Sequence, residues 1–416
     1  MTEKKPTIRF KGFDNDWEQR KLGEVAKDIS DGDWIEKEHI FDDGEYRIIQ
    51  TGNLGEGEYL DKPNNAKYFY QKDFDEIKAN EIFAGDLLIS RLAEPAGRTI
   101  ILPATNHRMV TAVDVTIIRP DDSFDSTFLM TQMNSSQTLN KVGKSVSGTS
   151  HKRISRKNLE KINLLIPSLN EQKRIGSFFK QLDHTITLHQ QQLENLKKAK
   201  KGYLQKMFPK NNEKVPEIRF EGFTDDWEQR KFAEVIEKIQ TGTNLLGSTE
   251  NSGTPLLKMG NIQRGYWSLE KLEYLSKNEI VEVDNVVQYG DFFFNTRNTL
   301  ELVGKGATWL GESGKYAFNS NIARFEFNGI DTVFFNYLYS TEILIKQVHA
   351  RAVGTTSVAA VYPRDLNSLE FRISTIEEQI KIGSFFKQLD DTITLHQRKL
   401  DYLKEMKKGL LQKMFV

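Results

Sequence analysis

Two stretches of the chain combine basic side chains with small hydroxyl residues, a mixture that suits contact with the phosphates of a nucleic acid. Residues 141–160 carry six Lys and Arg against the single acid Glu160. Residues 346–364 carry three basic residues and no acid. Each stretch also holds a Gly-Thr pair, where exposed amides can donate to phosphate oxygens. One such stretch alone is as easily an ordinary solvated loop, but its recurrence in two places favours a function.

Further cations and amides extend this set of candidate residues. Arg91 and Arg297 each follow a Gly-Asp pair at nearly the same distance, and either a DNA contact or a structural ion pair explains them. The full set of candidates for DNA contact is Arg91, Arg98, Arg108, Lys144, Thr149, Ser150, His151, Lys152, Arg153 and Arg156 in the first half of the chain and Asn295, Arg297, Lys305, Lys315, Arg324, Arg351, Thr355 and Thr356 in the second half.

The motifs of self-contained catalysis are missing from the sequence. There is no Gly-x-x-x-x-Gly-Lys-Ser/Thr loop, no Gly-x-Gly-x-x-Gly turn and no His-Glu-x-x-His helix. The Pro-Pro dipeptide of base-flipping amino methyltransferases is absent as well. Seven histidines without ligand spacing and zero cysteines predict no metal site. We therefore expect no catalytic residue and no cofactor in this chain, and binding is its default function.

The overall charge discriminates little between function classes, because 58 Lys and Arg balance 58 Asp and Glu. Any basic surface must therefore be local. Residues 28–45 hold eight acids and one Lys, so this acidic stretch should face solvent or repel nucleic acid. No apolar run is long enough to span a membrane, and no apolar segment follows Met1. Together with the lack of cysteine, these features predict a cytoplasmic protein.

The chain is an internal duplication. A leading motif at residues 6–21 returns at residues 216–231, and both copies contain Asp-Trp-Glu-Gln-Arg-Lys. Residues 164–208 return as residues 371–415, and Ile175–Asp183 is repeated without a change. Between these matched ends the two halves differ. Each half is thus a divergent domain followed by a preserved terminal segment.

The preserved segments have the periodicity of coiled-coil helices, with apolar residues at alternating spacings of four and three. Because a lone amphipathic helix is poorly stable in water, each helix should pair with the other. Both orientations are sterically open, and we expect antiparallel pairing about a pseudo-twofold axis. The seam consists of Ile175, Phe179, Leu182, Ile186, His189, Leu193 and Leu196 in the first copy and of Ile382, Phe386, Leu389, Ile393, His396, Leu400 and Leu403 in the second.

Polar residues in the seam recur at the same positions of both copies. His189 and His396 predict a hydrogen-bonded layer that fixes the register of the helices, in preference to a metal site or a pH switch. Lys200 and Lys407 should extend their ammonium groups into solvent.

Capping boxes mark the start of each helix in the sequence. They are Ser168 with Glu171 in the first copy and Thr375 with Glu378 in the second.

The expected fold is α+β, with two mixed domains separated by two long helices that form an antiparallel coiled coil. Strands are predicted near residues 86–90, 113–118, 290–295 and 323–327, and helices near residues 128–141 and 334–348. The predicted boundaries are 1–166 for the first domain, 167–208 for the first helix, 209–215 for a linker, 216–373 for the second domain and 374–416 for the second helix.

This organisation resembles the specificity subunit of type I restriction-modification enzymes. The resemblance covers essentially the whole chain and rests on the leading motif, on the repeated Ile-Gly-Ser-Phe-Phe-Lys-Gln-Leu-Asp helices and on the Lys-Lys-Gly-x-Leu-Gln-Lys-Met-Phe ends. It implies two target recognition domains, each reading one half of a split site on double-stranded DNA, and a helical spacer that fixes the gap. It also implies two methyltransferase subunits, which methylate adenine N6 with S-adenosylmethionine, and restriction subunits, which use ATP and Mg.

Two other classes of function stay open at this point. A self-contained nuclease or methyltransferase with an unrecognised site would be active as the isolated chain. A structural coiled-coil adaptor would need neither divergent domains nor basic loops. If the chain reads DNA, its dissimilar halves predict a site whose two parts differ in sequence.

Overall fold

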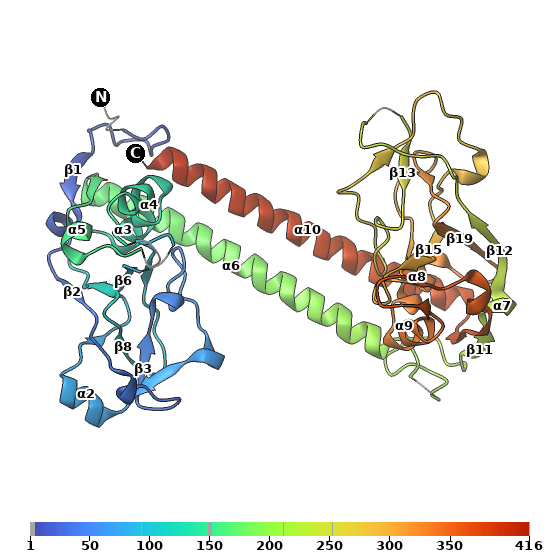
Figure 1. The fold of residues 1–416 in the computed structure, drawn as a ribbon, viewed down its shortest axis with the longest axis horizontal. Helices are drawn as coiled ribbons and strands as arrows, with labels where there is room; N and C mark the ends of the chain where they lie inside the picture. The colour runs from blue at the N-terminus through green and yellow to red at the C-terminus, as the bar shows by residue number, and fades with distance from the viewer. Residues whose placement is uncertain (1–4, 93, 149–151, 211, 252, 416) are drawn as a thin grey trace. The chain divides into compact units, whose positions relative to one another are not determined.

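The protein divides into two compact units, each of which receives one part of both long helices (Figure 1). The computed structural model describes residues 5–92, 94–148, 152–210, 212–251 and 253–415. The first unit comprises Met1–Gln190 with Arg398–Val416, and the second unit comprises Gln191–Gln397.

The first unit is built from short strands and helices that precede the first long helix. In chain order its elements are β1 (Glu18–Lys21), α1 (Leu22–Val25), β2 (Ile29–Asp31), η1 (Lys37–His39), β3 (Tyr46–Ile49), η2 (Thr51–Asn53), η3 (Pro63–Asn65), β4 (Lys67–Phe69), α2 (Gln71–Ile77), β5 (Glu81–Ile82), β6 (Leu87–Ser90), β7 (Thr99–Ile101), β8 (Arg108–Thr111), β9 (Val115–Ile118), α3 (Ser126–Met133), α4 (Ser136–Gly143), α5 (Arg156–Glu160), β10 (Asn163–Ile166) and the start of α6 (Leu169–Lys206).

The second unit repeats this plan after the end of α6. Its elements are β11 (Glu228–Lys231), α7 (Phe232–Val235), β12 (Ile236–Thr241), β13 (Pro255–Leu257), β14 (Glu273–Tyr274), η4 (Val283–Asn285), β15 (Phe292–Asn295), β16 (Arg297–Asn298), β17 (Gly306–Thr308), β18 (Ala317–Phe318), β19 (Ile322–Phe327), α8 (Thr332–Tyr339), α9 (Glu342–His349), β20 (Val353–Gly354), β21 (Ala359–Ala360), η5 (Pro363–Ser368), β22 (Glu370–Ile373) and the start of α10 (Ile376–Met414).

The central sheets of the two units correspond strand by strand, and the second sheets correspond in part. The first unit has an antiparallel sheet of order β2-β9-β6-β7, and the second unit has its counterpart, β12-β19-β15-β17. A second sheet pairs β3 with β8 in parallel, as β13 pairs with β18. The pair β1–β10 matches the pair β11–β22. The duplication seen in the preserved segments therefore extends through the divergent domains.

The expected strands are confirmed, whereas the expected helices are each broken into two. The strands are β6, β9, β15 and β19, and the broken helices are α3–α4 and α8–α9. In the first unit the break comes at Ser135, whose Oγ accepts a hydrogen bond from the amide of Thr138 and caps α4. In the second unit Thr341 donates to the carbonyl of Leu338 at the matching break (2.7 Å).

The long helices run antiparallel in each unit, as expected for a pseudo-twofold repeat. In the first unit Phe415, just beyond α10, packs on Phe179 near the start of α6, with ring centroids 5.9 Å apart. In the second unit Phe208, just beyond α6, stacks on Phe386 near the start of α10 at 6.0 Å. Most apolar seam residues are buried, and Leu196, Leu389 and Ile393 are half-buried. The histidine layer stays a prediction, because His189 and His396 belong to different units.

The expected solvent orientation of the seam lysines is wrong. The Nζ of Lys200 lies 2.5 Å from Oδ1 of Asp390, and the Nζ of Lys407 lies 2.5 Å from Oδ1 of Asp183. Each lysine therefore forms an ion pair with the other long helix. The spacing within one helix cannot reveal such a partner.

The predicted capping boxes are only partly present, because their glutamates have another partner. Ser168 Oγ accepts from the amide of Glu171 at 3.4 Å, as a cap should. The carboxylate of Glu171, however, accepts two hydrogen bonds from Arg9 at 2.7 and 2.8 Å. The second copy repeats this geometry with Glu378 and Arg219. These bonds raise the pKa of both arginines and tie each leading motif to the start of a long helix.

The tryptophan of each leading motif anchors the end of the other long helix. Trp17 is 1% exposed and packs against Phe128 and Phe415, at ring distances of 5.9 and 6.3 Å. Trp227 is 2% exposed and packs in the same way against Phe334 and Phe208, at 5.8 and 6.2 Å. The repetition of the leading motif is thus explained by packing.

Candidate nucleic-acid interface

Three segments of the first unit meet where β6 ends. The amide of Arg91 donates to the carbonyl of Asp114 in the loop before β9 (2.8 Å), and the amide of Ile154 donates to the carbonyl of Arg91 (3.0 Å). Ser147 and Arg153 exchange backbone hydrogen bonds within the basic stretch. We call the region formed by the described residues 91–92, 94–98, 112–114, 144–148 and 152–156 the first strand-end surface.

Arg91 is a structural residue of this surface. It is 4% exposed, its Nη2 lies 3.5 Å from Asp31 Oδ1, and it donates to the carbonyl of Val113. Burial lowers its pKa. Arg91 was open to two interpretations, a DNA contact or a structural ion pair, and its geometry is that of the ion pair. The buried side chain supports the loops of the first strand-end surface.

Acids from elsewhere in the unit neutralise much of the basic stretch. Arg153 Nε lies 2.8 Å from Asp114 Oδ1, and Arg156 Nε lies 3.6 Å from Asp31 Oδ2. Lys152 is exposed and lies 3.0 Å from Glu94. Sequence analysis missed Asp31 and Asp114 as partners, because they lie far from the basic stretch along the chain.

The side chains that remain available on the first strand-end surface are Lys144 and Arg98. Lys144 is exposed and has no ion pair among the described residues, and Arg98 is half-buried with its backbone bonded to Ser90. Glu94, Lys144 and Lys152 line a hollow of about 430 Å³ together with apolar residues. Three other candidates, Thr149, Ser150 and His151, lie outside the described residues.

Arg108 does not join this surface. It starts β8 in the other sheet of the unit and forms hydrogen bonds with Glu81 at 2.5 and 2.8 Å. Its guanidinium also lies over the ring of Tyr46, 4.3 Å from the centroid.

The second unit assembles the same three segments where β15 ends. Thr296 donates to the carbonyl of Asn321 in the loop before β19 (3.0 Å), and the amide of Val361 donates to the carbonyl of Thr296 (3.0 Å). The hairpin β20–β21 pairs with β16, which follows β15 directly. We call the region formed by residues 295–300, 319–321 and 353–361 the second strand-end surface.

Four of the predicted residues lie together on the second strand-end surface. Arg297 is exposed, and its side chain has no hydrogen bond or ion pair within the described part of the chain. Thr355 and Thr356 are exposed in the turn of the hairpin. Asn295 is fully buried, and its Oδ1 accepts from the amide of Arg297 at 3.0 Å, so it positions the arginine from below.

The other predicted residues of the second unit are engaged elsewhere. Lys305 lies beside Asn295 but donates to Gln263 at 2.7 Å, and burial lowers its pKa. Arg351 donates to Ser368 and to the carbonyl of Gln347.

Arg324 and Lys315 lie towards the opposite end of the central sheet. Arg324 is buried and pairs with Asp291 at 3.2 Å, just before β15 begins. Lys315 is exposed and pairs with Glu312 at 3.2 Å in the turn that follows β17.

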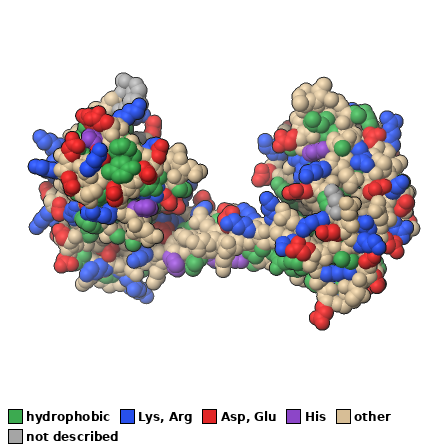
Figure 2. Space-filling model, turned by 90° about the horizontal axis from the view of Figure 1, so that it is seen from below, with side chains coloured by type: hydrophobic (Ala, Val, Ile, Leu, Met, Phe, Trp, Pro, Cys, Tyr) green, Lys and Arg blue, Asp and Glu red, His purple; other side chains and the backbone are tan. Residues whose placement is uncertain are grey.

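Basic and acidic side chains are interspersed over the face of each unit drawn in Figure 2. This mixture agrees with the zero net charge of the chain. On this face, basic side chains therefore occur in small groups among acidic ones.

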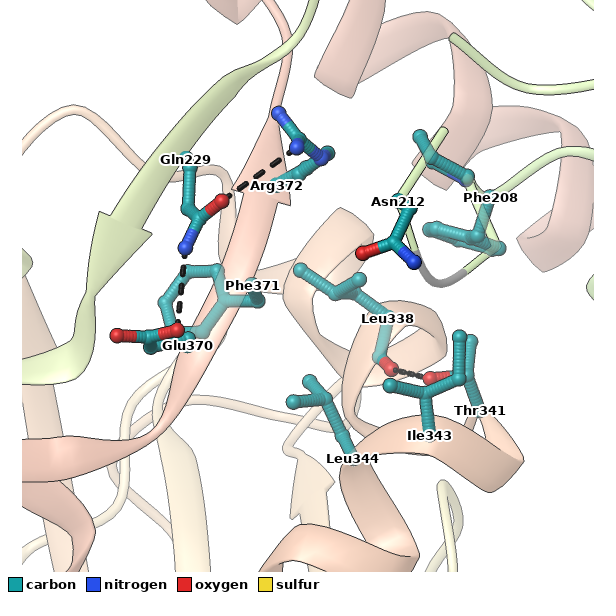
Figure 3. Close-up of a pocket in the computed structure, with 11 residues that line it drawn as sticks. Phe208, Asn212, Gln229, Leu338, Thr341, Ile343, Leu344, Glu370, Phe371 and Arg372 are labelled. Carbon is teal, nitrogen blue, oxygen red and sulfur yellow. Dashed lines mark hydrogen bonds between the residues drawn. The ribbon is translucent and has the colours of Figure 1, made fainter. Parts of the chain in front are cut away.

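A separate groove of about 340 Å³ lies near the end of α6 in the second unit (Figure 3). Its apolar wall includes Phe208 and Phe371, and Gln229 bonds to Glu370 and Arg372 at its rim. The groove shares no residue with the second strand-end surface, and it borders the Trp227 anchor.

The family model of the type I restriction modification DNA specificity domain matches this chain twice, at residues 14–198 and 224–405. The chain therefore belongs to the type I restriction-modification specificity family, whose members are non-catalytic DNA-recognition subunits. Both matches begin in a leading motif and extend into a long helix. No helix in the described part of the chain is long and apolar enough to cross a bilayer.

Relatives and solved structures agree with this assignment. The chain is 24% identical to the type I restriction enzyme MjaVIII specificity subunit of Methanocaldococcus jannaschii, over 95% of this chain and 91% of the relative. It is 24% identical to the EcoKI specificity subunit of Escherichia coli K12, over 45% of this chain and 41% of that subunit. The crystal structure of the S subunit from M. genitalium has the same fold, with a TM-score of 0.63, 13% identity and 99% coverage of both chains.

Proposed function

We propose that each unit reads one half of a bipartite DNA site, and that the two strand-end surfaces contact the DNA. The observation that carries this proposal is the repetition of one construction with different side chains. In the first unit the end of β6 contacts the loop before β9 and the segment that follows α3–α4. In the second unit the end of β15 contacts the loop before β19 and the segment that follows α8–α9. A shared scaffold with divergent residues suits two readers of different sequences.

The two surfaces present different chemistry to DNA. The first offers the exposed Lys144 and the half-buried Arg98, whereas the second offers Arg297 beside a hairpin of small hydroxyl residues. An exposed arginine can read guanine or bind a phosphate. The half-sites should therefore differ in sequence.

Replacing Arg297 with alanine is expected to weaken DNA binding while Lys315→Ala leaves it unchanged. Both residues are exposed cations of the same unit, but only Arg297 lies on the second strand-end surface. Loss of a base contact should cost about 1–3 kcal/mol of binding free energy. Loss of a phosphate contact should reduce the slope of log affinity against log salt concentration by about 1. Fluorescence anisotropy with duplex DNA at several salt concentrations measures both quantities. Equal affinities of the two variants would contradict our placement of the interface.

We further propose that the long helices dock two copies of a methyltransferase subunit. Leu188 on α6 and Leu395 on α10 occupy equivalent positions of the repeat and are 46% and 67% exposed. The other strongly exposed apolar residues of these helices are Ile376, Ile380 and Tyr402. Of these, only Ile376 has an apolar residue, Leu169, at the equivalent position of the other copy. Two identical apolar positions fit two identical partners.

The double substitution Leu188→Glu with Leu395→Glu is expected to abolish capture of the methyltransferase subunit. Both side chains are exposed, so the fold should tolerate the change, whereas a charge in an apolar contact prevents docking. The matched control is Leu246→Glu, because Leu246 is 86% exposed but lies outside the helices. Co-purification with the partner from the source cell provides the measurement. Full capture by the double variant would show that these leucines are not the docking points.

The proposal assigns all cofactors to the partners. S-adenosylmethionine would be bound by the methyltransferase subunits, and ATP and Mg by the restriction subunits. This chain would contribute DNA sequence recognition and the spacing of the two half-sites.

A further inference from the structure

A histidine and two carboxylates form a compact group in the first unit, outside the strand-end surfaces. His39 ends η1, and Asp73 and Glu76 lie on α2. One potential ligand atom from each residue lies within 4.8 Å of the other two. His39 Nδ1 is 2.8 Å from Asp73 Oδ1, although the residues are 34 positions apart.

Asp73 presents a buried oxygen that lacks a partner. The residue is 3% exposed, and while Oδ1 contacts His39, Oδ2 is buried without a hydrogen bond among the described residues. An unpaired carboxylate oxygen that has been removed from water is unfavourable unless a cation or a donor satisfies it. This oxygen is the second observation, independent of the clustering, that indicates a bound ligand.

The surroundings of His39 favour a cation. Glu38 Oε1 lies 4.0 Å from His39 Nε2, on the other side of the ring from Asp73. Within the described chain, no Lys or Arg forms an ion pair with Glu38, Asp73 or Glu76. Glu76 is exposed, so the group is open to solvent on one side.

We propose that His39, Asp73 and Glu76 bind one divalent transition-metal ion of the Zn²⁺ type. Imidazole nitrogen with two carboxylates is a donor set that suits Zn²⁺, whereas Mg²⁺ and Ca²⁺ prefer oxygen ligands alone. Water can complete the coordination on the exposed side. The histidine spacing predicted no metal site, because the ligands come from two segments that only the fold brings together.

The position of the group gives the ion a structural role. His39 packs edge-on against Phe69, with centroids 6.3 Å apart, beside a small core that includes Tyr46 and Val110. This core covers the sheet of order β4-β3-β8-β5. A metal ion would fasten η1, which belongs to the acidic stretch 28–45, to α2.

Zinc titration of the chelator-treated full-length chain tests this proposal. With a coloured chelator as competitor, we expect one tightly bound Zn²⁺ per chain and a higher Tm in its presence. Asp73→Asn and His39→Asn should each weaken Zn²⁺ binding by more than about tenfold, since even the outer partners of metal ligands carry effects of that size. The matched control is His184→Asn, because His184 is an exposed histidine on α6.

A third variant separates loss of a ligand from loss of the fold. Glu76 is exposed, so Glu76→Gln should leave the far-UV circular dichroism spectrum and the Tm of the metal-free chain unchanged while weakening Zn²⁺ binding. No tight Zn²⁺, equal affinity in the unchanged chain and the three ligand variants, or Mg²⁺ binding as tight as Zn²⁺ would each overturn the assignment.

Discussion

Replacing Trp227 with alanine is expected to lower the free energy of unfolding of the second unit by about 3–5 kcal/mol. The side chain is 2% exposed and packs against Phe208 and Phe334. It therefore joins the leading motif, the end of α6 and the start of α8. A cavity at this point should loosen the end of α6 as well as the domain.

Urea unfolding and hydrogen exchange measure this effect together. We expect reduced protection at residues 200–208 and 382–390 in the variant, and no change at the matching Trp17 anchor of the first unit. Trp34→Ala is the matched control, because Trp34 is 71% exposed. If both tryptophan variants unfold at the same urea concentration, the anchor is not what stabilises the unit.

Glu378→Ala is expected to cost about 3–5 kcal/mol, because it leaves the guanidinium of Arg219 without its partner in a largely buried position. Glu378 is fully buried, the Arg219 side chain is 14% exposed, and the two are joined by hydrogen bonds of 2.7 and 2.8 Å. The loss should release the leading motif of the second unit from the start of α10.

Two comparisons separate the ion pair from a general effect of substitution. The double variant Arg219→Met with Glu378→Leu should recover much of the lost stability, since apolar residues of similar size often replace a buried pair without loss. Asp391→Ala removes the exposed pair with Lys387 and should change the unfolding free energy by less than about 1 kcal/mol. A double variant as unstable as Glu378→Ala would show that the charges themselves are required.

The long helices were the most predictable part of the fold. Their seam repeats over many turns and recurs in both copies, so periodicity gave the helices. Their antiparallel pairing was expected from the pseudo-twofold symmetry of a duplicated chain. The breaks at Ser135 and Thr341 were not predicted, because apolar spacing continues through them and only side-chain hydrogen bonds interrupt the helices. The partners of Lys200 and Lys407 were missed, since they lie on the opposite helix.

The candidate interface was predictable as a set of segments but less so as a set of side chains. The described parts of the two basic stretches and the residues after β6 and β15 do meet in space. Arg91 and Arg153 have acidic partners that are distant in sequence, so local charge overstated the positive surface. The same reason hid the contact of Arg9 with Glu171, 162 positions away. Sequence gives residue types and local spacing, whereas pairing across the fold decides which charges remain available.

The most direct test of the central claim is sequencing of modified bases in genomic DNA from the source cell with and without this gene. Our account predicts that N6-methyladenine is lost from one two-part motif with a fixed gap. It further predicts the result of a domain exchange. When residues 232–369 of this chain are replaced by the equivalent segment of another specificity subunit, methylation should shift to a motif that is changed in one half only. An unchanged methylation pattern without the gene, or a domain exchange that alters both halves of the motif, would contradict the account.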